Sequence, residues 1–282
     1  MKVAVLGAGT MGHGIAQVAA AAGCEVALRD VDEAAVARGL AGIEKSLAKA
    51  VEKQKTTPDA AKATRSRIHG TADLAAAVRE ADLVVEAVPE RLELKRSVLS
   101  EVRSSAPREA IFATNTSSLP IASIADALPA AERGRFVGMH FFNPVPVMKL
   151  VEIVRGPETS QATVDAVVAL SQRMGKETIV VRDSPGFATS RLGLAIGLEA
   201  IRMREEDVAS AEDIDKAMTL GYNHPMGPLR LTDLVGLDVR LHIAEGLAKS
   251  LGPRFEPPSL LRRMVGEGKL GQKSGEGFYR WP

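Results

Sequence analysis

Short apolar runs alternate with amphipathic stretches along the chain through residue 181. The apolar runs are typical of buried strands and lie at 2–6, 25–30, 82–88, 110–114, 135–142, 148–154 and 178–181. Helical periodicity separates most of them, at 15–22, 33–55, 60–66, 71–79, 91–104 and 160–174. Strands that alternate with helices pair into a parallel, doubly wound sheet, so the pattern predicts an α/β fold.

The pattern changes at Pro185 and Gly186. Beyond them no strand pattern of comparable strength occurs, and helical periodicity covers 187–203, 211–220, 229–250 and 258–265. The tail at 269–279 is rich in glycine and basic residues, a composition that predicts a loop. We therefore expect a boundary near residue 184, with an α/β domain over 1–183 and an all-α domain over 184–282.

The first predicted strand runs directly into a glycine turn, Gly7-Ala-Gly9-Thr10-Met11-Gly12, that leads into a helix. In such a turn the first glycine allows the tight bend, the second lets the backbone approach a pyrophosphate, and the third lets helix and strand pack closely. The helix N-terminus favours the bound anion. The α/β domain is therefore predicted to be a Rossmann domain, with a mainly parallel sheet that binds a dinucleotide.

Asp30 ends the second predicted strand and indicates which dinucleotide is bound. A carboxylate about 20 residues past the turn accepts hydrogen bonds from the adenosine ribose and repels the extra phosphate of NADP. We therefore expect NAD. Arg29 complicates this choice, because a neighbouring arginine can accommodate that phosphate.

The composition argues against several other classes of protein. Thirty-six Lys and Arg against 35 Asp and Glu leave a net charge of +1, so no nucleic-acid or membrane partner is expected. No apolar run spans a bilayer, and no signal peptide is expected before the first strand. Cys24 is the only cysteine; we expect it to pack in the core of a cytoplasmic protein. No metal-ligand spacing such as HExxH occurs, so no metal is predicted.

Two polar features have both a structural and a chemical interpretation. His140 and Glu152 lie on predicted strands joined by the short turn 143–146, so they could face each other as an acid–base pair or be ordinary strand positions. The predicted helix at 33–55 carries Lys45, Lys49, Lys53 and Lys55, which form either a solvated face or an arm that meets phosphates. The spacing alone leaves both alternatives open.

Six stretches together resemble the 3-hydroxyacyl-CoA dehydrogenase family over essentially the whole chain: GAGTMGHGIAQVAA, NTSSLPI, GMHFFNPVPVMKLVEI, DSPGF, HPMGPLRLTDLVGLD and GQKSGEGFY. The resemblance implies NAD-dependent oxidation of (3S)-3-hydroxyacyl-CoA to 3-oxoacyl-CoA, and the reverse reduction. The length resembles that of family members that act on short chains, 3-hydroxybutyryl-CoA and acetoacetyl-CoA. The family resemblance also implies a role in fatty-acid metabolism and a homodimer formed through the C-terminal helices. The apolar stretches of these helices lie at 192–201 and 229–251.

The resemblance also implies roles for individual residues. His140 is the general acid and base, since histidine ordinarily titrates near neutral pH, and Glu152 fixes its tautomer. Ser117 hydrogen-bonds the substrate oxygen. The remaining implied positions are Asn115 and Asn143 at the nicotinamide and catalytic centre, Glu90, Lys95 and Lys273 at the cofactor, Lys95 also at the substrate, and Ser46 and Lys53 at coenzyme A.

The chain departs from the family pattern at one position. Where much of the family has an asparagine after DSPGF, this chain has Ser190, whose shorter side chain replaces a direct contact to the thioester region by a water-bridged one.

Two other functions remain open: dehydrogenation of a free hydroxy acid or sugar acid on the same fold, and a non-catalytic cofactor-binding scaffold.

Overall fold

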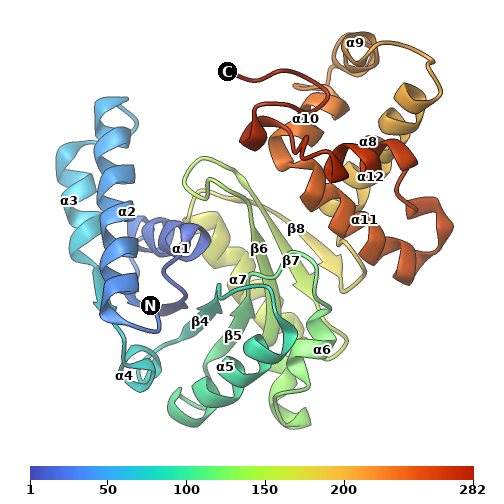
Figure 1. Cartoon of the computed structure of the whole chain (residues 1–282). Coiled ribbons are helices and arrows are strands. Elements are labelled where there is room, and N and C mark those ends of the chain that lie inside the picture. The colour runs from blue at the N-terminus through green and yellow to red at the C-terminus, as the bar shows by residue number, and fades with distance from the viewer. The chain divides into compact units, whose positions relative to one another are not determined.

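The computed structural model describes all 282 residues. The chain forms two compact units, Met1–Ser184 and Pro185–Pro282. Figure 1 shows that the first unit combines a sheet with helices and that the second is built of helices. The α/β sheet domain followed by an all-α domain, expected from the sequence, is thus confirmed.

The sheet of the first unit has eight strands in the order β3-β2-β1-β4-β5-β6-β7-β8. Their bounds are β1 (Lys2–Leu6), β2 (Glu25–Arg29), β3 (Ile68–Thr71), β4 (Leu83–Glu86), β5 (Ile111–Thr114), β6 (Phe136–Phe141), β7 (Leu150–Arg155) and β8 (Glu177–Arg182). All pairs from β3 to β6 are parallel, β7 is antiparallel to β6, and β8 is parallel to β7. The carboxyl ends of β1, β4, β5 and β6 therefore lie at one edge, where ligands bind in such sheets.

Helices connect the strands and cover the sheet. They are α1 (Thr10–Ala21), α2 (Glu33–Glu52), α3 (Pro58–Ser66), α4 (Leu74–Val78), α5 (Leu92–Ser105), α6 (Ile121–Ala125) and α7 (Gln161–Arg173), with a 3₁₀ helix at Ala130–Arg135. Short polar side chains begin several of them, because they satisfy free backbone N–H groups. Asp32 thus accepts from Ala35 at the start of α2, and Ser160 accepts from Thr163 at the start of α7.

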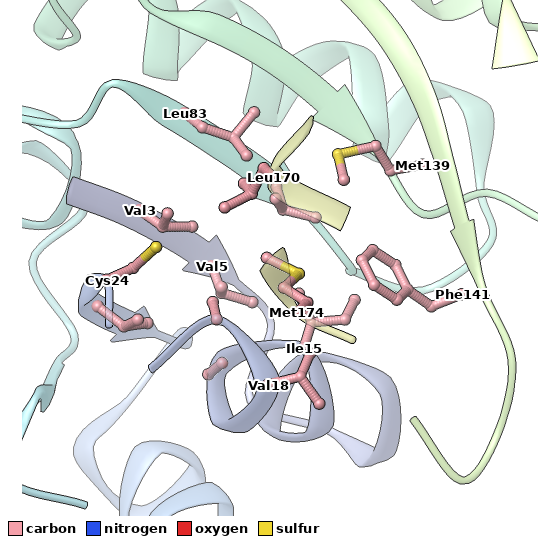
Figure 2. Packing of buried hydrophobic residues seen from close by; sticks show 14 of the residues in the cluster. Val3, Val5, Ile15, Val18, Cys24, Leu83, Met139, Phe141, Leu170 and Met174 are labelled. Carbon is pink, nitrogen blue, oxygen red and sulfur yellow. The ribbon is translucent and has the colours of Figure 1, made fainter. Parts of the chain in front are cut away.

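Side chains alternate between the two faces of each strand, and each face packs on its own helices. Figure 2 shows one face, where strand residues such as Val5 and Phe141 pack against Ile15 of α1 and Leu170 of α7. Cys24 is fully buried in this core, in the packing role expected for it. The other face packs on α5 and α6, and its positions on β6 are Phe136, Gly138 and His140.

Some elements of the first unit differ from the sequence predictions. Helix α1 begins at Thr10, within the glycine turn and earlier than predicted, despite the low helix propensity of Gly12 and Gly14. No strand was predicted at 68–71, because the sequence IHGT is short and largely polar. This segment forms β3, an edge strand that pairs with β2. The helix predicted at 71–79 is consequently shorter, at Leu74–Val78.

The second unit consists of α8 (Thr189–Glu205), α9 (Ala211–Gly221), α10 (Pro228–Val235), α11 (Leu237–Leu251) and α12 (Ser259–Gly266), with 3₁₀ turns at Pro253–Phe255 and Gln272–Ser274. The prediction of a single helix at 229–250 is wrong, because Gly236 has φ +102° and separates α10 from α11. The tail is held by Asp233, whose buried carboxylate accepts from the backbone of Phe278 and Tyr279 and from the Trp281 indole. None of the helices has the length and apolar character needed to cross a membrane.

Candidate active site

The three glycines of the turn differ in their surroundings in the way a dinucleotide turn requires. Gly7 has φ +100°, and a Cβ there would lie 2.6 Å from the Ala87 carbonyl oxygen. A Cβ on Gly12 would lie 1.7 Å from the carbonyl oxygen of Gly7. A Cβ on Gly9 would meet no atom within 4 Å, so this glycine faces open space. Open space beside the N-terminus of α1, at Thr10 and Met11, fits the close approach of a pyrophosphate.

This difference predicts that an alanine substitution at Gly9 affects cofactor binding, whereas one at Gly12 affects stability. Gly9→Ala leaves folding intact, because its φ of −65° suits any residue and the Cβ meets nothing, but it weakens NADH binding by roughly tenfold or more by blocking the pyrophosphate. Gly12→Ala instead lowers the melting temperature, since its Cβ overlaps backbone. Fluorescence titration with NADH and thermal denaturation measure the two effects. Unchanged NADH affinity in Gly9→Ala would contradict this placement of the cofactor.

Asp30 follows β2 and lies against the glycine turn. Its Oδ2 accepts a hydrogen bond from the backbone N–H of Ala8 at 2.7 Å, and Oδ1 accepts from Val31 at 2.7 Å. A carboxylate has about four acceptor sites, so both oxygens can still accept from a ribose. Arg29 donates its Nε–H to the carbonyl of Ala72 at 3.2 Å.

Removal of the Asp30 carboxylate should relax the cofactor preference. In Asp30→Ala, the affinity for NADH falls and that for NADPH rises, because the hydrogen-bond acceptor and the repulsive charge are both lost. Asp32→Ala is the matched control, since Asp32 caps α2 and accepts only from Ala35 there. The ratio of kcat/KM for the two cofactors is the measurement, and an unaltered ratio in Asp30→Ala would refute the assignment.

His140 and Glu152 are directly opposite each other on β6 and β7. His140 Nδ1 lies 2.7 Å from Glu152 Oε2, a distance typical of a charge-assisted hydrogen bond. Both side chains are buried, His140 at 7% and Glu152 at 0% relative exposure, and the imidazole also packs on the Phe142 ring. The antiparallel pairing therefore makes the two residues face each other, an arrangement that the sequence left open.

This pair can carry out proton transfer. An ionised Glu152 accepts the Nδ1–H of His140, which leaves Nε2 as the basic nitrogen of the neutral ring. When Nε2 takes up a proton, the buried carboxylate stabilises the imidazolium that forms.

The polar loop after β5 is held by Glu90. Glu90 Oε1 accepts from Thr116 Oγ1 at 2.6 Å and from the backbone N–H groups of Ser117 and Ser118 at 2.9 and 3.1 Å. The Ser117 and Ser118 hydroxyls lie 3.3 and 3.1 Å from the same oxygen. Although burial opposes it, the bond from Thr116 and the charge of Lys95 lower the pKa of Glu90, so this carboxylate is ionised at neutral pH.

Asn115 connects this loop to the strand that carries His140. Its Oδ1 accepts from the backbone N–H of Phe141 at 2.9 Å. Asn143 follows two residues after Phe141 and is exposed at the start of the turn. Ser117, Asn115, Asn143 and the His140–Glu152 pair therefore all belong to the carboxyl edge of β5 and β6.

Three other candidate residues lie on helices of the first unit. Ser46 is half-buried on α2, and Lys53 is exposed at its C-terminal cap. Lys95, on α5, is only 1% exposed and its ammonium contacts Glu86 and Glu90. The family resemblance implies that Lys95 lies at the cofactor and the substrate. It did not point to Glu86, although an acid at the end of a buried strand is a recognisable signal.

Two candidates lie in the second unit. Ser190 is the second residue of α8 and half-buried. Lys273 lies in the 3₁₀ turn of the tail, and its Nζ donates to Asp238 at 2.6 Å. This hydrogen bond lowers the pKa of the Asp238 carboxyl. The structure has no cluster of three or more His, Cys, Asp or Glu side chains that could hold a metal.

A dinucleotide-binding sheet whose carboxyl edge carries a paired histidine and carboxylate is typical of a nicotinamide-dependent dehydrogenase. The chain belongs to the 3-hydroxyacyl-CoA dehydrogenase family: the model of the NAD binding domain matches residues 2–184, and that of the C-terminal domain matches residues 186–281. It is an NAD-dependent oxidoreductase that interconverts 3-hydroxyacyl-CoA and 3-oxoacyl-CoA.

Individual relatives match over the full chain. A probable 3-hydroxybutyryl-CoA dehydrogenase of Deinococcus radiodurans is 46% identical over 282 residues, which are 100% of both chains. The human mitochondrial hydroxyacyl-coenzyme A dehydrogenase is 45% identical over 286 residues, 99% of this chain and 90% of the human protein. Among solved structures, the (S)-3-hydroxybutyryl-CoA dehydrogenase of Ralstonia eutropha matches with a TM-score of 0.94 and 41% identity, covering 100% of this chain and 99% of its own.

Proposed function

We propose that the chain acts on short-chain substrates, 3-hydroxybutyryl-CoA and acetoacetyl-CoA, with His140 as general acid and base and Glu152 as its partner. The observation that carries the proposal is the 2.7 Å contact between His140 Nδ1 and Glu152 Oε2, buried at the carboxyl edge of the sheet. The names of the relatives from Deinococcus radiodurans and Ralstonia eutropha support the short-chain substrate.

In the oxidising direction, His140 Nε2 takes the proton of the substrate's 3-hydroxyl while the carbonyl forms at C3. Bound NAD⁺ supplies the acceptor for the hydride that leaves C3. Glu152 stabilises the imidazolium and holds the ring in one orientation. Ser117 Oγ hydrogen-bonds the substrate oxygen from the loop anchored by Glu90. In the reducing direction, His140 returns the proton to that oxygen.

The remaining assignments concern the cofactor and coenzyme A. The glycine turn, including Thr10 and Met11, would hold the pyrophosphate and Asp30 the ribose. Asn115 and Asn143 would lie at the nicotinamide, and Glu90, Lys95 and Lys273 would contact the cofactor. Ser46 and Lys53 lie seven residues apart, two turns along α2, so they share one side of that helix. A hydroxyl and an ammonium on one side of a helix suit a phosphate-bearing ligand such as coenzyme A. Ser190 would take the position that contacts the thioester region.

A comparison of thioester and free acid tests the substrate class. Purified protein with NADH should consume acetoacetyl-CoA but not free acetoacetate, as followed by loss of nicotinamide absorbance. Turnover of acetoacetate alone would favour a free hydroxy acid substrate, and tight NADH binding without turnover would favour a non-catalytic scaffold. A series of 3-oxoacyl-CoA thioesters of increasing length tests the short-chain preference, which predicts the highest kcat/KM for the four-carbon substrate.

We also propose that the protein is a homodimer formed through its helical unit, and that it acts in cytoplasmic fatty-acid metabolism. Large apolar side chains are exposed on this unit, Leu192 at 64%, Leu220 at 81% and Tyr222 at 76%, and a dimer interface would remove such side chains from water. The free, buried Cys24 suits a reducing compartment. Sedimentation equilibrium should give twice the mass of 29.9 kDa, and a monomer at micromolar concentration would contradict the dimer.

A further inference from the structure

Lys176 is a buried lysine that the proposed reaction does not use. It follows Gly175, whose φ of +72° ends α7, and it directly precedes β8. The residue is only 6% exposed. Burial lowers the pKa of this lysine, and no neighbouring carboxylate offsets the effect. Because a buried ammonium without a counter-charge costs stability, the presence of this lysine calls for another explanation.

The Lys176 ammonium donates to two backbone carbonyls of a single turn. Nζ donates to the carbonyl oxygen of Val145 and, at 2.8 Å, to that of Met148. Both oxygens belong to the turn 143–148, which joins β6 to β7. Strand β8 pairs with β7 from its first residue onward, so Lys176 lies beside the end of this turn.

The turn has few donors of its own for these carbonyls. Pro144 and Pro146 have no N–H. The N–H groups of Val147 and Met148 both donate to the Pro144 carbonyl, at 2.9 and 3.0 Å. The two carbonyls that the ammonium holds are therefore bonded from outside the turn.

Val145 attaches the turn to α1. Its side chain is buried, and a Cβ on Gly14 of α1 would lie 2.8 Å from the Val145 Cβ. The other residues of the turn are exposed, so side-chain packing does not fix them. The ammonium bonds the carbonyl of this anchored residue and that of Met148, three residues further on. It therefore determines the path of the backbone from the anchored residue to the end of the turn.

Asn143 is the first residue of this turn and follows His140 by three residues. It is exposed, so the backbone of the turn determines where its amide points. His140 and Glu152 lie opposite each other on the two strands that the turn connects. A backbone shift would therefore move Asn143 relative to this pair, and a misplacement of about 1 Å can cost on the order of 10²-fold in rate.

We propose that Lys176 is a positioning residue: its ammonium fixes the turn 143–148 and so holds Asn143 beside His140 and Glu152. The inference rests on the proposed function, in which Asn143 lies at the nicotinamide and His140 transfers the proton. Lys176 has no contact with cofactor or substrate in this role. Its effect on turnover passes through Asn143 and should disappear when the Asn143 amide is removed.

A double-mutant cycle tests this route. Lys176→Met removes the donors with little change in side-chain volume and should lower kcat for acetoacetyl-CoA reduction by about tenfold. In an Asn143→Ala background the same substitution should change kcat by less than about twofold, because the group that it positions is already absent. Lys149→Met is the matched control: Lys149 is exposed just after the turn, and its substitution should leave kcat within about twofold.

An equal loss of kcat from Lys176→Met in both backgrounds would overturn the inference, because it would indicate a general structural effect. An unchanged kcat in Lys176→Met, or in Asn143→Ala, would overturn it as well. If Lys176→Met does not fold, Lys176→Gln, whose shorter side chain cannot bridge the two carbonyls, goes through the same cycle. Failure of the unsubstituted protein to reduce acetoacetyl-CoA would refute the proposed function instead, so the two failures are distinguishable.

Discussion

His140→Gln should lower kcat for acetoacetyl-CoA reduction by about 10³-fold, while the dissociation constant for NADH stays within about threefold. General acid–base catalysis contributes roughly 10²- to 10⁴-fold in enzymes, and glutamine keeps a polar side chain in the buried site without a group that titrates. The imidazole lies 2.7 Å from Glu152 on β6 and β7, away from the glycine turn, so its replacement should leave NADH binding intact. Initial rates and NADH fluorescence titration measure the two quantities.

His69→Gln is the matched control. His69 is on the edge strand β3, and its side chain is exposed, with a long 3.9 Å contact to Glu25, so its substitution should change neither quantity by more than about twofold. Simultaneous loss of NADH binding and turnover in His140→Gln, with a lowered melting temperature, would instead mean that His140 has a structural role.

Glu152→Gln should reduce kcat by about 10²-fold, the second-largest effect that the site predicts. An amide can donate its own N–H to Nδ1 and so favour the tautomer with the proton on Nε2, which is the wrong nitrogen for a base. It also carries no charge to stabilise the imidazolium. Because Glu152 is 0% exposed, the isosteric glutamine preserves the packing, and KM for NADH should change little.

The pH dependence of kcat and thermal denaturation separate a chemical effect from misfolding in this variant. Glu177→Gln serves as control, because Glu177 is exposed at the start of β8, beyond the β7 strand that carries Glu152. A Glu152→Gln variant that retains more than half of the kcat would show that the carboxylate does not assist the proton transfer.

The sequence predicted the glycine turn and its consequences well, because local physics determines them. Gly7 has a positive φ, and Gly12 packs so closely on the Gly7 backbone that a Cβ would not fit. Both requirements follow from the strand-turn-helix pattern. Whether His140 and Glu152 face each other depends on the register between their two strands and on the alternation of side chains along each strand. The sequence showed that the two residues could be opposite each other, but it did not determine the register.

Other features escaped because tertiary structure overrides the local pattern. Helical periodicity continues through Gly236, and only its φ of +102° shows that the helix breaks there. The IHGT strand becomes a strand only because β2 offers it a partner. Lys95 was named from the family resemblance, but its burial within the apolar stripe of α5 and its pairing with Glu86 depend on contacts between two elements.

Every residue assignment at the site depends on one reaction, the transfer of a hydride between a nicotinamide and C3 of an acyl-CoA thioester. The most direct test incubates the protein with NADH carrying deuterium at both C4 positions and with acetoacetyl-CoA, and locates the label in the product by mass spectrometry and NMR. We expect 3-hydroxybutyryl-CoA with one deuterium, bonded to C3. Product without deuterium, or with deuterium at the thioester carbon, would contradict the claim.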